Sequence, residues 1–153
     1  MISNKILEEV LRMNRQIEID WGKHGKVTAT LLDDKNPEIC NIFWNLLPFK
    51  TFQIHAAVSG YMMYCYTPLN NARHLNKVRY RANYVDQKVG TINASGTGLL
   101  TTLYGEVTED LMNQPIAVVN ESDIGTLKEV GKKVWHSVYF TKEKIIVEYR
   151  KKS

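Results

Sequence analysis

Short runs of alternating apolar and polar residues, separated by glycine or proline, constrain the fold of this chain more than any other feature. Residues 17–21 and 27–31 both alternate in this way, and a turn bounded by Gly22 and Gly25 separates them. Alternation with a period of two is typical of a strand with one buried face, and a short glycine-bounded turn between two such strands indicates a β-hairpin. The same pattern predicts further strands in these ranges: 49–58, 61–69, two within 88–107, 117–119, 137–140 and 144–149.

Two other segments have the apolar spacing of an amphipathic helix. Asn36 as the N-cap and Pro37 at the first helical position form a start signal for a helix over 37–47. A second helix is predicted over 123–134, and a short N-terminal helix is expected at about 3–13. Many short strands with few helices indicate an antiparallel barrel or sandwich whose open ends are closed by the helices.

Length and composition are those of an ordinary globular protein. Residues 1–153 fit one domain, and 44% of the side chains are apolar while 24% are charged. We therefore expect a single, mainly β domain, built as a closed barrel of about eight strands. No run has the length of a membrane span or the form of a signal peptide, so we expect a cytoplasmic protein without a membrane partner. Cys40 and Cys65 are expected to be buried free thiols.

The charge and histidine patterns argue against nucleic-acid and metal binding. The net charge is only +4, and the main internal basic cluster lies at 73–81, within a polar stretch over 70–87 that we expect to be a long functional loop. The four histidines lack metal-ligand spacing, so no metal is expected. A glycine cluster at Gly96 and Gly98 lacks the third glycine and the following helix of a dinucleotide loop, so no such cofactor is expected.

A few polar side chains within apolar runs are candidates for chemistry. His55 is either a hydrogen-bonded structural histidine or an acid or base at a pocket. Tyr64 and Tyr66 share one strand face, which belongs either to the core or to an aromatic pocket wall. Glu106 is either an idle exposed acid or a carboxylate base whose pKa is raised by Tyr104 and apolar neighbours. We predict a barrel mouth walled by the three tyrosines, with His55 and Glu106 as its ionisable pair.

Several blocks of the sequence resemble the bacterial cyclophilin-like domain families. They extend over about 17–149 and comprise Phe43–Phe49, His55, Ser59–Gly60, Tyr64, Gly90–Ile92, Thr102–Gly105 and Leu127–Trp135. Within these families, the chain resembles most the cyclophilin-like domain associated with cucumopine synthase. That resemblance implies a cofactor-independent enzyme that condenses histidine with 2-oxoglutarate and closes a ring by a Pictet–Spengler-type reaction. The residue constellation of prolyl isomerases is absent, so that activity is not expected.

Such chemistry needs carboxylate anchors, a proton donor and a base, and the sequence offers candidates for each. The candidate catalytic residues are His55, Glu106 and Tyr104. The candidate substrate-binding residues are Tyr64, Tyr66, Arg73, Ser95 and Thr97. The partners implied are an amino acid and a 2-oxo acid, and homo-oligomerisation stays open. The alternative is a non-catalytic module that binds small carboxylates, or a subunit whose pocket is completed by a partner.

Overall fold

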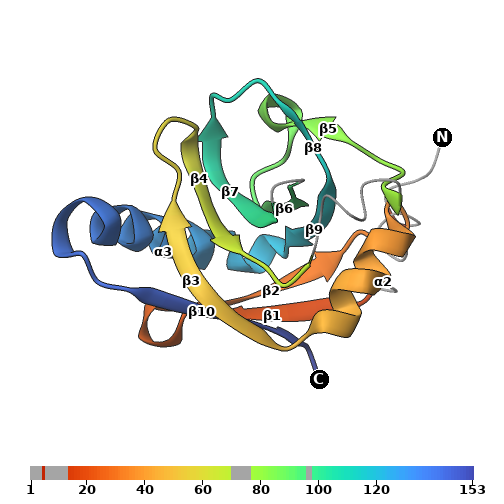
Figure 1. The fold of residues 1–153 in the computed structure, drawn as a ribbon, viewed down its shortest axis with the longest axis horizontal. Coiled ribbons are helices and arrows are strands. Elements are labelled where there is room, and N and C mark those ends of the chain that lie inside the picture. The colour runs from red at the N-terminus through yellow and green to blue at the C-terminus, as the bar shows by residue number, and fades with distance from the viewer. Residues whose placement is uncertain (1–4, 6–13, 70–76, 96–97) are drawn as a thin grey trace.

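Eight antiparallel strands close into a barrel in the order β1-β10-β3-β4-β7-β6-β9-β2 (Figure 1). The structure is a computed structural model and describes residues 5, 14–69, 77–95 and 98–153. The helix expected at about 3–13 thus lies almost wholly outside the described residues. The barrel strands are β1 (Gln16–Asp20), β2 (Lys26–Leu31), β3 (Phe49–His55), β4 (Gly60–Tyr66), β6 (Thr91–Ala94), β7 (Leu99–Val107), β9 (Pro115–Val119) and β10 (Ile145–Lys151). The predicted mainly β, closed eight-stranded barrel is confirmed.

The barrel interior is filled by side chains from alternate strand positions, as the periodicity of two requires. Ile17 and Ile19 of β1 have no exposed surface, whereas the neighbouring polar residues are half-buried. The predicted hairpin forms, because β1 pairs with β2 through a short 3-10 turn, η1 (Gly22–His24). Gly22 and Gly25 have φ angles of 62° and 138°, which side chains with a Cβ rarely adopt.

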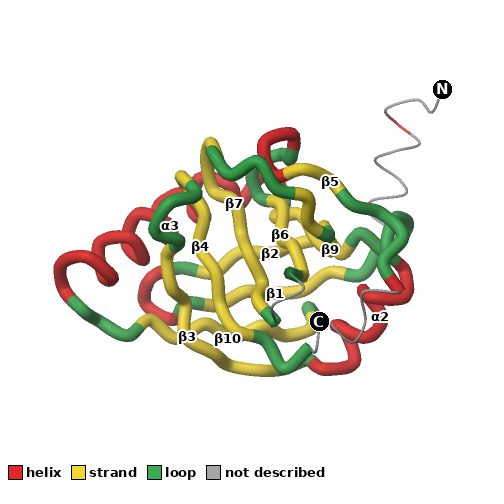
Figure 2. Tube along the Cα trace, turned by 45° about the horizontal axis from the view of Figure 1, so that its top comes forward, coloured by secondary structure: helices red, strands yellow, loops and turns green. Residues whose placement is uncertain are grey.

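Two helices lie on opposite sides of the barrel, and both views show them there (Figures 1 and 2). The first is α2 (Pro37–Leu46), which buries Ile39, Cys40 and Phe43. The Phe43 ring meets the ring of Tyr149 edge-on at a centroid distance of 6.3 Å, so α2 seals one end of the barrel. The helix predicted over 37–47 is confirmed.

Asn36 precedes α2 as predicted, but its side chain does not cap the helix. Instead, the fully buried amide bridges two distant segments. Its oxygen accepts hydrogen bonds from the backbone N–H groups of Arg79 and Tyr80, both at 2.8 Å. Its nitrogen donates to the carbonyl oxygens of Tyr80 and Pro115, at 3.0 and 2.8 Å. Asn36 thereby fixes the last part of the basic cluster, at Arg79 and Tyr80, to the start of β9 at Pro115.

The second helix, α3 (Ile124–His136), packs across β2, β3, β4 and β7 at the other barrel end. The strand predicted at 137–140 is wrong, because a π-helical turn, η5 (Ser137–Thr141), continues the helix there. The Ser137 hydroxyl donates to the Val134 carbonyl at 2.7 Å, and the Lys142 N–H donates to the Ser137 carbonyl at 2.7 Å. These bonds hold the backbone helical until Lys142, whose φ of 60° ends the turn.

A small second sheet covers the outside of the barrel beside β6 and β7. It consists of β5 (Ala82–Asn83) and β8 (Met112–Asn113). The 3-10 turn η3 (Tyr84–Asp86) follows β5 directly, and a second 3-10 turn, η4 (Glu121–Asp123), leads from β9 into α3. Tyr84 packs with Met62 and Leu103 on the outer barrel face. The described part of the predicted loop over 70–87 is therefore partly ordered by this sheet. Within the described ranges, no helix has the length and apolar character needed to cross a bilayer.

Candidate active site

A hydrogen-bonded histidine–tyrosine pair lies at the α3 end of the barrel. His55 is the last residue of β3, and its Nε2 lies 2.6 Å from the hydroxyl oxygen of Tyr104 on β7. The Nδ1 atom of His55 lies 2.8 Å from the carbonyl oxygen of Ala56. Because a carbonyl oxygen only accepts, Nδ1 carries the hydrogen of the neutral ring and Nε2 accepts from the tyrosine hydroxyl. The geometry therefore assigns both the tautomer and the direction of the bond.

Burial keeps both members of this pair neutral. His55 and Tyr104 are 6% and 4% exposed. Desolvation lowers the pKa of His55, against the opposing effect of its bond to the Ala56 carbonyl. Desolvation, with a smaller contribution from Tyr61, raises the pKa of Tyr104 to about 12. At neutral pH the pair is thus an unprotonated imidazole facing a protonated phenol, which can pass a proton from the phenol oxygen to Nε2.

The pair lies at an open hollow of about 800 Å³ between α3 and the β3–β4 turn. Among the described residues, its lining combines aromatic rings, one lysine and two histidines and includes no acidic side chain. Its lining residues are His55, Ala56, Ala57, Gly60, Tyr61, Tyr104, Lys132, Trp135, His136 and Tyr139. The Tyr61 ring meets the Tyr104 ring edge-on at a centroid distance of 5.6 Å, and the centroids of the Trp135 and Tyr139 rings lie 5.3 Å apart. A ligand with an aromatic ring and an anionic group fits such a lining.

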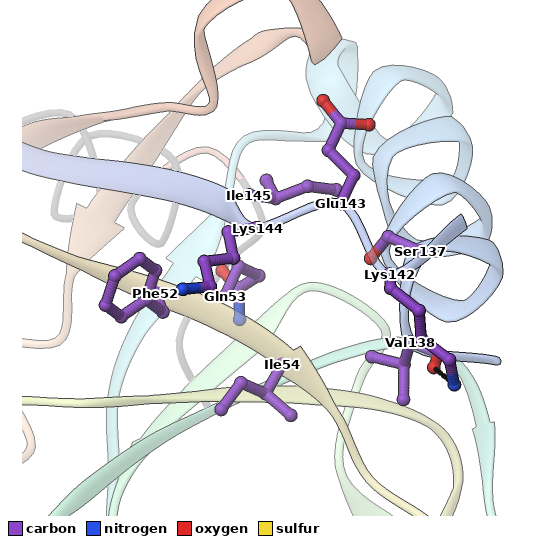
Figure 3. A pocket seen from close by; sticks show the side chains of 9 residues that line it. All are labelled: Phe52, Gln53, Ile54, Ser137, Val138, Lys142, Glu143, Lys144 and Ile145. Carbon is purple, nitrogen blue, oxygen red and sulfur yellow. Dashed lines mark hydrogen bonds between the residues drawn. The ribbon is translucent and has the colours of Figure 1, made fainter. Parts of the chain in front are cut away.

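A second hollow, of about 300 Å³, lies between η5 and the outer face of β3 (Figure 3). Ile54, Val138 and Phe52 give it a mainly aliphatic and aromatic lining. The side-chain amide of Gln53 already has hydrogen-bond partners, because its oxygen accepts from Trp21 Nε1 and its nitrogen donates to the Tyr64 carbonyl, both at 2.9 Å. The carboxylate of Glu143 turns away from Ile54 in Figure 3 and meets Lys23 at 3.2 Å. This hollow thus offers less chemistry than the one containing His55 and Tyr104.

The predicted aromatic wall does not form, because Tyr64 and Tyr66 lie on the opposite face of the sheet from Tyr104. In the register of β4 with β7, Met63 pairs with Thr102 and Tyr64 with Thr101. Met63 and Cys65 are fully buried in the barrel core, so Tyr64 and Tyr66, which alternate with them along β4, point outward. They form their own edge-on contact at a centroid distance of 6.4 Å.

The other predicted site residues are dispersed. Glu106 lies two positions beyond Tyr104 on β7 and is exposed to solvent. Ser95 precedes β7, in a turn where its N–H donates to the Leu99 carbonyl at 2.8 Å. It therefore lies at the opposite end of the strand from Tyr104. Arg73 and Thr97 lie outside the described residues. Of the predicted set, the structure brings together His55 and Tyr104.

The side of the hollow that α3 and η5 contribute was not predicted from the sequence. The spacing i, i+3, i+4, i+7 places Lys132, Trp135, His136 and Tyr139 on one helical face, and all four line the hollow. This spacing indicates a second helical face beside the buried one. It was hidden by the strand predicted at 137–140, which interrupted the helical period. Among the described residues, no three His, Cys, Asp or Glu side chains are grouped so as to hold a metal ion.

The chain is thus an antiparallel eight-stranded barrel with a hollow, lined largely by aromatic rings, beside its end helix. Among solved structures, the chain is similar to that of McbB in complex with tryptophan, with a TM-score of 0.84 and 34% sequence identity. The match covers 90% of this chain and 45% of the McbB chain, so this chain spans less than half of McbB. No protein-family model and no curated protein sequence matches the chain.

Proposed function

We propose that the chain binds an aromatic amino acid in the hollow beneath α3 and condenses its amine with a carbonyl compound in a Pictet–Spengler-type reaction. The observation that carries the proposal is the 2.6 Å contact of His55 with Tyr104 inside an aromatic hollow. The tryptophan bound in the McbB structure and the sequence resemblance to the cucumopine synthase branch both support an amino-acid substrate. Both tryptophan and histidine carry a ring carbon that can attack an iminium ion.

The lining suggests how such a substrate would be held. The aromatic ring would lie among Tyr61, Trp135 and Tyr139, whose faces and edges favour stacked and edge-on contacts. The carboxylate would meet Lys132, the one lysine of the lining, whose ammonium also lies 3.3 Å from Glu129. The described part of this lining carries no acidic side chain, which favours a carboxylate there. The substrate amine would then face the Tyr104 hydroxyl.

The His55–Tyr104 pair would supply the base for the first step. The ammonium of the amino acid gives a proton to the Tyr104 oxygen while the Tyr104 hydrogen passes to His55 Nε2. The neutral amine then forms a C–N bond with the carbonyl carbon, giving a carbinolamine. Return of the proton from His55 lets the hydroxyl leave as water, which produces an iminium ion.

Ring closure would use the same pair a second time. The nucleophilic ring carbon attacks the iminium carbon and forms the new C–C bond. The ring regains its aromaticity when its proton passes through Tyr104 to His55, and His55 becomes neutral again when this proton returns through Tyr104 to the secondary amine of the product. The sum of the steps is one amino acid and one carbonyl compound giving one cyclic amine and one water, without oxidation or reduction. The binding of both reactants in one hollow would supply much of the acceleration.

The finer identification from the sequence, histidine with 2-oxoglutarate, is one case of this reaction class. The competing function is a binding module without catalysis, or a subunit completed by another polypeptide.

Calorimetric titration followed by mass spectrometry separates these functions. Tryptophan, histidine and phenylalanine are titrated singly, and each is then incubated with 2-oxoglutarate, pyruvate or glyoxylate. Binding followed by a product lighter than the sum of its reactants by one water supports the proposal. Binding without product assigns a module or subunit, and the absence of binding by every amino acid rejects the site. Tyr64→Phe serves as a matched control, because it removes a tyrosine hydroxyl from the outer face of the barrel.

A further inference from the structure

We propose that Gly131 is a positioning residue that lets α3 lie directly against Tyr104 and so holds the phenol in contact with His55. The structural part of this inference is independent of the reaction. Its consequence for turnover rests on the proposed function.

Gly131 lies in the middle of α3, on the face that is buried against the barrel. Leu127, Val130 and Val134 on this face are fully buried. A Cβ atom added at Gly131 would lie 2.5 Å from Cδ2 and Cγ of Tyr104 and 2.6 Å from its Cδ1. Real Cβ atoms essentially never approach other atoms so closely. The ring of Tyr104 therefore occupies the space that any other side chain at position 131 would fill.

The requirement at Gly131 is for space, because its backbone is helical and its φ is not positive. Glycine is disfavoured inside helices, so an alanine would be the better helix former at this position if it fitted. Gly125 of the same helix provides the contrast, because a Cβ added there meets nothing within 4 Å. The Tyr104 ring thus requires a glycine at position 131, whereas no contact requires a glycine at position 125.

The Tyr104 ring has little room to move away from a larger residue. Tyr61 meets it edge-on at a centroid distance of 5.6 Å, and His55 meets it edge-on at the same distance. A methyl group at Gly131 must displace the ring toward one of these neighbours. Either displacement alters the 2.6 Å hydrogen bond between the Tyr104 hydroxyl and His55 Nε2. In this way the helix backbone at Gly131 sets the geometry of the pair without touching the substrate.

A double-mutant cycle tests the coupling of Gly131 to Tyr104 without any substrate. The variants are Gly131→Ala, Tyr104→Ala, their combination, and Gly125→Ala as the matched control. We expect Gly131→Ala to lower the thermal unfolding midpoint and Gly125→Ala to leave it unchanged or raise it. In the Tyr104→Ala background, Gly131→Ala should no longer lower the midpoint, because the ring is gone. An equal loss in both backgrounds overturns the inference.

Two further measurements report on the pair itself and do not depend on a stable Tyr104→Ala variant. Nitrogen NMR of the imidazole should show the Nδ1–H tautomer of His55 in the wild type and in Gly125→Ala, and a mixture of tautomers in Gly131→Ala. Ultraviolet titration should show the Tyr104 phenol ionising closer to the ordinary tyrosine range of about 10 in Gly131→Ala. Unchanged spectra and titration in a folded Gly131→Ala protein contradict the positioning role.

Turnover, measured on whichever substrate pair is found, completes the test. Gly131→Ala should lower kcat by roughly 10-fold to 100-fold, since displacements of about 1 Å can cost this much, and leave KM for the amino acid within about twofold. A kcat equal to that of the wild type rejects the catalytic consequence. If the wild type itself proves inactive, the proposed function fails, whereas the thermal cycle and the spectra still decide whether Gly131 positions Tyr104.

Discussion

The Nε2 atom of His55 lies 2.6 Å from the hydroxyl oxygen of Tyr104, although 49 positions separate the two residues in the chain. β4 lies between their strands in the barrel, so the two side chains converge over the end of this strand from either side. The contact joins two of the three predicted catalytic residues, whereas the third, Glu106, is exposed to solvent. It also makes the role of His55 testable against that of Glu106, which the sequence paired with it.

His55→Gln should reduce turnover by about 10²–10⁴-fold, because the base of the proposed reaction is lost. Tyr104→Phe should produce a loss of the same order, since the phenol oxygen connects the substrate to His55. Steady-state kinetics of both variants, with Tyr64→Phe as the control, measures these losses. A folded His55→Gln protein with wild-type turnover would make His55 a structural histidine. Glu106→Gln separates the two pairings, because a loss as large as that of His55→Gln would favour the pair predicted from the sequence.

The free energy of unfolding should decrease as the pH is lowered below about 6.5, partly because of His55. Burial lowers the pKa of this imidazole in the folded protein, so the unfolded chain takes up a proton at a higher pH than the folded one. The stability contributed by the neutral ring is therefore present above the unfolded pKa and is lost as the pH falls through the folded pKa. Thermal melts of wild type and His55→Gln across this range check the prediction. Identical pH slopes for both proteins would contradict it.

Lys132→Met should weaken binding of the amino acid by about twofold to fivefold, with kcat nearly unchanged. The proposed ion pair holds the substrate in the ground state and the transition state alike, so its loss affects KM. Because Lys132 is largely exposed, with 70% of its side chain accessible, the effect should not exceed this range. Lys128→Met is the matched control, since Lys128 is an exposed lysine of α3 that does not line the hollow. Equal KM values for both variants would remove Lys132 from the site.

Cys40 and Cys65 should resist thiol reagents in the folded protein. Both are fully buried, and burial raises the pKa of each thiol to about 12. The reactive thiolate is then on the order of one part in 10⁴ near pH 8. Absorbance after addition of a disulfide reagent should reveal two thiols after denaturation and almost none before. Rapid labelling of the native protein would show that one of these segments opens readily.

Much of the barrel could be predicted because its signals are local. The hairpin of β1 and β2 needs only alternation and two glycines, and α2 needs only its apolar period and the Asn36–Pro37 start. The error at 137–140 arose from a local ambiguity, because the β-branched Val138 and the aromatic Tyr139 and Phe140 fit a strand as well as a helical turn. The bond from the Ser137 hydroxyl to Val134 favours the helical backbone, and β10 begins only at Ile145.

The site required information that no local pattern carries. The sequence by itself determined that His55, Tyr64, Tyr66 and Tyr104 lie on strands, because strand periodicity is a property of a few consecutive residues. Only the tertiary structure decided that Tyr104 points inward to His55 while Tyr64 and Tyr66 point outward. A shift of one residue in the pairing of β4 with β7 would change which side chains face each other, and this register is set by packing across the whole barrel. The wall from α3 likewise depends on where the helix docks, which Gly131 permits by leaving room for the Tyr104 ring.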